Sequence, residues 1–398
     1  MAIKFSRRTN WPTHLNPIAQ ALEKKRAAGD SFIDLTESNP TRSEFVSLKE
    51  NPKYSPDPRG LLKARESVCR YYAEKKIRVT PDQVFLTAST SEAYSFIFRL
   101  MMDPGDALLV PRPSYPLLDY LCSLSDITPR GYSLVYEDRW KIDTQGLGAL
   151  WSGETRGLIV VNPNNPTGNF VKENEKNAIN ALCEKNGRFV ISDEVFFDFA
   201  FPDDGDASAT KRGGSAMNYG GSFAGNEEVL SFTVSGISKV LGLPQMKLSW
   251  IIVSGPPSLR KEAAARLEVI ADTFLSVNTP SQQALPKWFQ SRERIQREIL
   301  KRLLFNKKCL EKEFQKSEKV GILKNEGGWV AVLQIDSKKT DEMLALELLE
   351  KQSVLVHPGY FFDFDQGCLL VLSLLPPPES FKKGVRRLQD FFERDNGF

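Results

Sequence analysis

The sequence has few of the side chains on which metal and triad chemistry depend. Only two histidines occur, His14 and His357, and the five cysteines include no Cys-x-x-Cys pair. A transition-metal site and a histidine-centred catalytic triad therefore have few candidate residues, and we expect no metal. An odd number of scattered cysteines also argues against a disulfide framework. It favours a reducing compartment, so we expect a cytoplasmic protein.

Charge of one sign and long apolar runs are lacking too. Lys and Arg number 53 against 50 Asp and Glu, a net charge of +3, so we expect no nucleic-acid partner. No apolar run reaches the length of a transmembrane helix, and residues 1–11 lack the apolar stretch of a secretory signal. We therefore expect no membrane partner. With 398 residues, the chain is long enough for roughly two domains.

Short apolar runs alternate with helical patterns in the middle of the chain. The predicted strands are 84–87, 107–110, 158–161, 188–192, 229–234 and 250–254, and the predicted helices between them include 92–102 and 174–186. This alternation is typical of the α/β class, with a mostly parallel sheet flanked by helices. Ligands of such sheets bind outside the carboxyl ends of the strands.

The last third of the chain has a different pattern. Predicted helices at 291–316, 343–352 and 380–393 enclose predicted strands at 329–335 and 369–375. We interpret residues 286–398 as a smaller α+β domain, which residues 1–45 join because chain ends often pack together. The large domain then spans 46–285.

Charged residues follow two of the strands. Lys239 ends the turn Ser235-Gly236-Ile237-Ser238-Lys239, and a lysine with a lowered pKa is a nucleophile toward aldehydes. Asp193 and Glu194 follow an apolar strand, where a carboxylate can keep a pyridinium nitrogen protonated. The plainer alternatives are a solvated surface lysine and a helix N-cap.

Polar turns follow three further strands. A predicted helix begins near Thr90 and Ser91, and the backbone N–H groups and hydroxyls at a helix start can bind an anion. Residues 89–92 also match a Ser-x-x-Glu capping box. Asn165 offers an amide to a phenolate oxygen, or belongs to a plain turn. Tyr115 can stack on a planar ring, or is a packing residue. Together these groups match what pyridoxal phosphate (PLP) requires.

The combination resembles the fold-type I PLP enzymes, specifically the class I/II aminotransferases related to aspartate aminotransferase, over nearly the whole chain. Its most specific pieces are Asn-Pro-Thr-Gly at 165–168, Asp193-Glu194 after a strand, and Ser238-Lys239. The resemblance implies PLP in a cleft between a large sheet domain and a small domain built from both chain ends. It also implies a homodimer that moves an amino group from an amino donor to a 2-oxo acid or aldehyde in a ping-pong cycle.

The resemblance also implies residue roles. Lys239 would form the aldimine, a Schiff base, with PLP and move the proton, and Tyr54 would reach the phosphate of the neighbouring subunit. The residues assigned to cofactor binding are Tyr54, Thr90, Ser91, Tyr115, Asn165, Asp193, Phe196, Ser235, Ser238 and Lys247.

Three departures from the family pattern affect the cofactor. Phe196 stands where the family usually has tyrosine, which removes a phenol donor from the ring oxygen of PLP. Gly236 stands where serine is frequent, with Ser235 one step earlier. Lys247 replaces an arginine on the phosphate, which keeps the charge and loses the bidentate fork.

The fourth departure affects the substrate. Val371 stands where the family has the arginine that binds the substrate α-carboxylate, and no arginine occurs between residues 353 and 383. Either another residue binds the carboxylate, with Arg42 and Arg112 as candidates, or the substrate differs. His357 either faces the cleft or is structural.

Two other functions remain open at this point. A PLP-dependent lyase, decarboxylase or substitution enzyme would explain both Phe196 and Val371. A regulatory protein built on the same fold would need an added nucleic-acid-binding domain, for which 398 residues and a charge of +3 leave little support.

Overall fold

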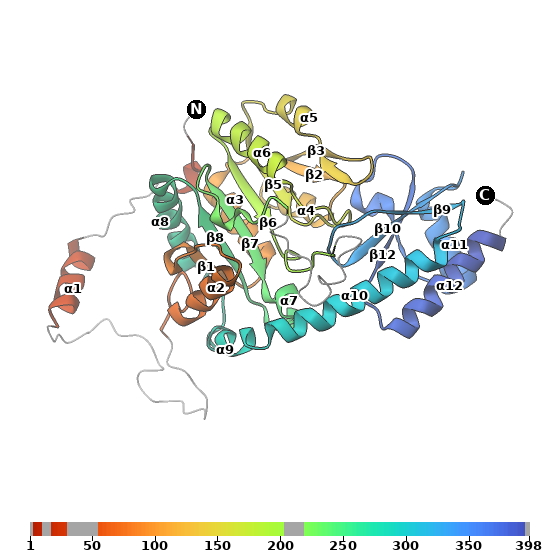
Figure 1. Ribbon diagram of the computed structural model, residues 1–398. Helices are drawn as coiled ribbons and strands as arrows, with labels where there is room; N and C mark the ends of the chain where they lie inside the picture. The colour runs from red at the N-terminus through yellow and green to blue at the C-terminus, as the bar shows by residue number, and fades with distance from the viewer. Residues whose placement is uncertain (1–2, 10–16, 30–54, 203–218, 395–398) are drawn as a thin grey trace.

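Two sheets lie next to each other in the structure, a computed structural model that describes residues 3–9, 17–29, 55–202 and 219–394. Figure 1 shows the larger sheet at the left and centre, the smaller sheet at the right, and one long helix, α10 (Arg292–Phe314), running below both. Within the described residues, no helix is both long and apolar enough to cross a membrane.

The large sheet is mostly parallel. Its strands are β1 (Val84–Thr87), β2 (Ala107–Arg112), β3 (Thr128–Tyr136), β4 (Trp140–Ile142), β5 (Thr155–Val161), β6 (Phe189–Asp193), β7 (Ser231–Gly236) and β8 (Ser249–Ser254). They lie in the order β1-β8-β7-β6-β5-β2-β3-β4. Only β8, paired with β1 and β7, and β4, paired with β3, run antiparallel to their neighbours. The carboxyl ends of β1, β2, β5, β6 and β7 therefore meet at one edge.

Helices cover both faces of the large sheet. They are α2 (Leu62–Glu74), α3 (Thr90–Met101), α4 (Leu117–Ser123), α5 (Thr144–Ala149), α6 (Glu173–Asn186), α7 (Ile237–Val240), α8 (Pro257–Phe274) and α9 (Thr279–Phe289); α1 (Pro17–Ala28) precedes them. Helices α3, α4 and α8 pack on one face, and α5 and α6 pack on the other. Burial on both faces explains why these strands are continuous apolar runs.

The small sheet is antiparallel, in the order β11-β12-β10-β9. Its strands are β9 (Val320–Leu323), β10 (Val330–Ile335), β11 (His357–Pro358) and β12 (Cys368–Ser373), and it packs with α10, α11 (Asp341–Gln352) and α12 (Pro378–Arg394). Its other face shares an apolar core with the large sheet, because Val332 and Val371 pack in one cluster with Leu109 and Val160.

Helix α10 joins the two sheets. Near its start, the Gln296 amide donates to the carbonyl of Val240 in α7 at 3.0 Å. Farther along, the Asn306 amide donates to the carbonyl of Leu374, directly after β12, at 2.9 Å. The helix therefore fixes the small sheet relative to the strand ends of the large one.

Most of the predicted elements are present, and the α/β fold class is confirmed. Strands β3, β4, β9 and β11 and several helices were not predicted. One expectation is wrong: Lys239 lies in the single-turn helix α7 rather than in an open turn. The predicted domain boundary at 286 falls inside α9.

The described N-terminal residues differ from the expectation that 1–45 joins the small domain. Ile3 and Phe5 pack against the core of the large sheet, and Ser6 N–H donates to the carbonyl of Leu100 in α3 at 2.9 Å. Arg7 pairs with Asp103 at 3.1 Å. Apolar burial under α3 places residues 3–9 on the large sheet.

Candidate active site

The carboxyl edge of the large sheet brings together most of the predicted site residues. Asp193 ends β6, and Lys239 lies in α7, directly after the neighbouring strand β7. The other predicted residues at this edge, each next to the end of a large-sheet strand, are Thr90, Ser91, Tyr115, Asn165, Phe196, Ser235, Ser238 and Lys247.

Asp193 is a hydrogen-bonded carboxylate with a perturbed pKa. Its Oδ2 accepts from the hydroxyl of Tyr94 at 2.9 Å, and its Oδ1 accepts from Val195 N–H at 3.1 Å. Burial raises the pKa of Asp193 to about 6, against the opposing effects of these bonds and of the Lys239 charge. A nearby cation would therefore stabilise the ionised form of Asp193.

Lys239 lies between aromatic rings. Its Nζ is 4.9 Å from the ring centre of Trp329 and 5.4 Å from that of Phe196. Burial lowers the pKa of Lys239, and the charge of Asp193 opposes that shift. A lowered pKa increases the fraction of neutral amine, which is the nucleophilic form.

The turn after β5 leaves one asparagine unpaired. The side chain of Asn164 donates to the carbonyl of Pro113 at 3.0 Å, and that of Asn162 donates to the carbonyl of Gly221 at 3.2 Å. The buried Oδ1 of Asn165, in contrast, has no hydrogen-bond partner among the described residues. Buried polar atoms are rarely left unpaired, so Asn165 is a candidate for contact with a ligand.

Gly168 in the same turn approaches the small sheet. It has φ +71°, and a Cβ there would lie 2.6 Å from the carbonyl oxygen of Gly327. Its own carbonyl accepts from Glu326 N–H at 3.1 Å. The glycine of the Asn-Pro-Thr-Gly motif thus serves the contact between the two sheets.

The start of α3 combines a cap with free polar groups. Ser89 Oγ accepts from Glu92 N–H at 3.1 Å, while the Glu92 carboxylate accepts from Ala88 N–H at 2.7 Å. The predicted capping residues therefore do cap this helix. The first helical residues, Thr90 and Ser91, are partly exposed at the sheet edge.

The segment around Lys239 explains one departure from the family pattern. Gly236 pairs with Ser249 of β8, and a Cβ at Gly236 would lie 2.2 Å from Ser249 Oγ. Ser235 is buried, and its hydroxyl donates to the carbonyl of Glu194 at 3.3 Å, so its proton is not available to a phosphate. Ser238 is partly exposed and Lys247 is exposed.

The structure also places the residues considered for substrate binding. Val371 is 1% exposed and sealed in the core between the sheets. Arg112 forms ion pairs with Asp119 and, at 3.3 Å, with Asp363, which neutralise its charge. His357 is exposed beside aromatic rings of the next turn, whereas Arg42 lies outside the described residues.

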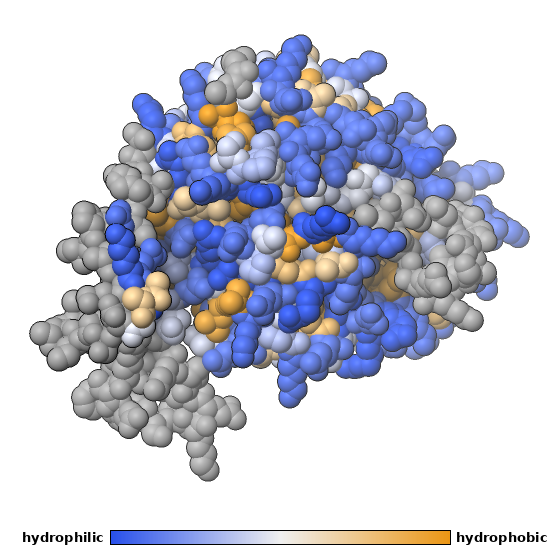
Figure 2. All heavy atoms as spheres, turned by 60° about the vertical axis from the view of Figure 1, so that its left-hand side comes forward, coloured by the Kyte–Doolittle hydropathy of each residue, from blue (hydrophilic) through white to orange (hydrophobic). Residues whose placement is uncertain are grey.

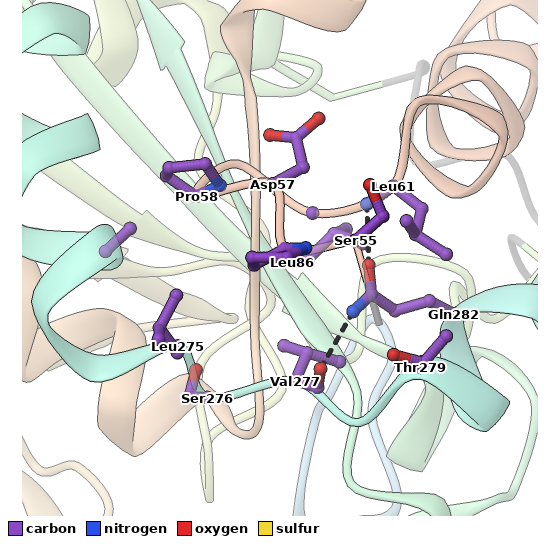
Figure 3. Close-up of a pocket in the computed structure, with 13 residues that line it drawn as sticks. Ser55, Asp57, Pro58, Leu61, Leu86, Leu275, Ser276, Val277, Thr279 and Gln282 are labelled. Atoms are coloured by element: carbon purple, nitrogen blue, oxygen red, sulfur yellow. Dashed lines mark hydrogen bonds between the residues drawn. The ribbon is translucent and has the colours of Figure 1, made fainter. Parts of the chain in front are cut away.

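Two predicted aromatic residues take different positions. Tyr115 is 48% exposed and stacks on no described ring. Tyr54 lies outside the described residues, but the segment after it lines a cavity of about 40 Å³ (Figure 3). Gln282 spans this cavity, accepting from Leu61 N–H at 2.6 Å and donating to the carbonyl of Val277 at 2.8 Å.

Two residues at the site had no sequence signal. Tyr94 looks like any apolar-face residue of α3, yet it donates to Asp193. Trp329 directly precedes β10 of the small sheet and reaches Lys239 only because the two sheets pack together. Neither contact can be inferred from local spacing.

The sequence matches the family described as "Aminotransferase class I and II" over residues 26–373. It is 25% identical to the alanine aminotransferase of Mycobacterium tuberculosis (94% of this chain, 89% of that protein). It is 32% identical to the S-alkyl-thiohydroximate lyase of Arabidopsis thaliana over 50% of this chain and 40% of that protein. The fold is similar to that of the alanine aminotransferase from Pyrococcus furiosus, with TM-score 0.77 and 23% identity over 98% and 100% of the two chains.

Proposed function

This chain belongs to the class I and II aminotransferases, which depend on PLP, and from that premise we propose that Lys239 attaches the cofactor and transfers the proton. The protein is a PLP-dependent aminotransferase. The observation that supports the role of Lys239 is its place beside Asp193 at the carboxyl edge of the sheet, with a pKa lowered by burial.

The described residues fit PLP. The side chain of Asn165, whose Oδ1 has no partner among the described residues, would donate to the ring oxygen through its Nδ2 group. Asp193 is a buried carboxylate whose ionised form the positive charge of a protonated pyridine nitrogen would stabilise. When bound, PLP supplies an electron sink for the carbon from which a proton is removed.

The residues around Lys239 set its chemistry. Burial between Phe196 and Trp329 keeps a larger share of the amine neutral, so that Nζ can accept a proton and later return it. Asp193 would keep the pyridine nitrogen of bound PLP protonated, and Tyr94 orients that carboxylate through its hydroxyl. Phe196 offers no hydroxyl, so Asn165 is the proposed donor to the ring oxygen.

A phosphate group fits the start of α3. The first N–H groups of a helix have no intrahelical partner and favour an anion. Thr90 and Ser91 lie there, and Ser238 and the exposed Lys247 lie at the same sheet edge. Ser235 is the one predicted ligand for which the contacts favour a structural role instead.

We further infer a homodimer with shared sites. Large apolar side chains are exposed near the cavity of Figure 3, among them Leu62 at 51%, Phe274 at 47% and Leu275 at 50%. Figure 2 shows apolar patches among hydrophilic residues on this side of the molecule. Gln282 anchors the segment directly after Tyr54 in this region, which supports the proposed reach of Tyr54 into a neighbouring subunit.

We infer a cytoplasmic location from the cysteines. All five are free thiols, and burial raises the pKa of Cys122 to about 12 and that of Cys368 to about 11. Thiols in this state suit a reducing compartment.

The proposed role of Lys239 is tested by Lys239→Ala. The variant should lose the absorption band that PLP acquires on attachment to a lysine, while its circular dichroism stays unchanged. Lys176→Ala is a matched control, because burial also lowers the pKa of Lys176. A band that persists in Lys239→Ala would refute the assignment.

Incubation of the PLP-loaded protein with an amino donor alone distinguishes transfer of the amino group from elimination. An aminotransferase converts its PLP to pyridoxamine phosphate, one equivalent per 2-oxo acid released, when incubated with a donor alone. Release of ammonia or a thiol without that conversion would instead indicate a lyase, the alternative that the replacement of arginine by Val371 motivates.

A further inference from the structure

Trp329, directly before β10 of the small sheet, lies next to the proposed catalytic lysine. Its ring centre lies 4.9 Å from Lys239 Nζ and meets the ring of Phe196 edge to face at 5.4 Å. A second edge-to-face contact joins it to Phe199 at 5.1 Å. The amine of Lys239 is therefore bordered by one ring from each sheet.

The backbone around Trp329 is fixed on two sides. Its carbonyl accepts from Leu374 N–H at 2.8 Å, directly beyond β12. On the other side, Gly328 N–H donates to the carbonyl of Phe199 at 2.9 Å, and Gly327 pairs with Ala200 in an isolated bridge. Trp329 is thus a rigid part of the site wall.

The indole N–H of Trp329 is buried and has no acceptor among the described residues. Two other buried indole N–H groups, those of Trp140 and Trp151, also lack one. Within the described part of the chain, Trp329 is the one tryptophan whose ring lies within 6 Å of Lys239 Nζ. A buried tryptophan usually finds a partner for its N–H, so a ligand bound in the site is a candidate acceptor.

Among the described residues, no cation stands at the position from which the family's arginine binds the substrate carboxylate. Val371 is sealed in the core, and the guanidinium of Arg112 is paired with Asp119 and Asp363. The backbone carbonyl of Trp329 accepts a hydrogen bond from the N–H of Leu374, which lies three positions after Val371. A neutral donor therefore lies near the strand from which the family's arginine would reach.

We propose that Trp329 is a specificity-determining residue, whose indole N–H donates a hydrogen bond to an oxygen of the substrate carboxylate. This rests on the proposed function, because it assumes an amino acid or 2-oxo acid bound next to Lys239. It predicts that carboxylate recognition depends on the N–H group and not on the size of the ring.

Trp329→Phe keeps an aromatic wall and removes the donor. Pyruvate binding to the PLP-loaded protein is measured by calorimetry, with acetone as the probe that lacks the carboxylate. We expect Kd for pyruvate to rise about tenfold, as for loss of a hydrogen bond to a charged group, with acetone unaffected. Trp151→Phe, which removes an equally unpartnered N–H elsewhere, should leave both unchanged.

Kinetics give a second measurement. Conversion of bound PLP by L-alanine is compared with conversion by ethylamine, the same skeleton without its carboxylate. Trp329→Phe should lower the second-order rate constant for conversion by L-alanine about tenfold. It should lower that for conversion by ethylamine less than about twofold.

Specific outcomes overturn the proposal. If Trp329→Phe weakened the binding of pyruvate and acetone by the same factor, Trp329 would act through packing alone. The same conclusion would follow if it slowed conversion by L-alanine and by ethylamine equally. An unchanged pyruvate Kd, or pyruvate that binds the wild-type protein no better than acetone, would also refute it. Failure of the proposed function looks different, because then Lys239→Ala would retain the lysine-attached absorption band.

Discussion

Tyr94→Phe tests whether the Tyr94 hydroxyl stabilises the ionised form of Asp193. The substitution removes one oxygen atom and one hydrogen bond, of 2.9 Å, to Asp193 Oδ2. Burial raises the pKa of Tyr94, so its hydroxyl remains a donor throughout the accessible pH range. The perturbation is therefore confined to one donor on one carboxylate.

The expected magnitude follows from the pKa of Asp193. Burial raises it from 3.8 to about 6, so the folded protein binds a proton that the unfolded chain has lost between these values. The free energy of unfolding therefore falls as pH rises through this window, by about 3 kcal/mol for a shift of this size. A hydrogen bond to a charged group contributes about 1.5–3 kcal/mol against about 1 for a neutral one. Tyr94→Phe should thus cost about 1 kcal/mol more at pH 8 than at pH 5.

The assay is urea unfolding of the cofactor-free protein at both pH values. Asp193→Asn provides the matched background, because its side chain does not titrate and the cost of Tyr94→Phe should there be equal at pH 5 and pH 8. An equal cost at both pH values in the wild-type background would show that Tyr94 does not stabilise the carboxylate. That result would refute its proposed positioning role.

Two further perturbations test the phosphate site and the contact between the sheets. Lys247→Ala should weaken PLP binding about tenfold in equilibrium dialysis if its ammonium meets the phosphate, while Lys247→Arg retains most of the affinity; an unchanged Kd for Lys247→Ala contradicts the assignment. Glu326→Gln should destabilise the protein by about 3 kcal/mol in urea unfolding, because buried Glu326 pairs with Lys172 and accepts from Phe170 N–H at 2.9 Å. Glu379→Gln, which breaks the exposed pair with Lys382, should cost less than about 1 kcal/mol, and equal costs for the two variants would contradict the role of Glu326.

The family and the proposed reaction could be predicted from local sequence features. Asp193 ends a strand of the large sheet, and Lys239 and Asn165 each follow one, as the apolar runs and turn residues indicated. Parallel strands bring such positions to one edge, so a correct topology was enough to group these residues. The departures at Phe196, Lys247 and Val371 were also readable, because they are substitutions within recognisable motifs.

Other site features depended on long-range packing. Tyr94 and Asp193 are 99 positions apart, and Tyr94 shares the pattern of the core residues around it. Ser235 was predicted to bind the cofactor, yet its hydroxyl is engaged with the carbonyl of Glu194, 41 positions away. Local spacing carries no information about such partners.

The sequence by itself determined the strand runs, the turns that end them and the chemical types of the groups placed there. Those features depend on apolar periodicity and on Asn, Pro and Gly, which act over a few residues. Only the tertiary structure decided that Trp329 borders Lys239, that Val371 is sealed in a core and that Arg112 is neutralised. These outcomes depend on how two separately formed sheets pack against each other, and that packing is set by side chains distant in the chain.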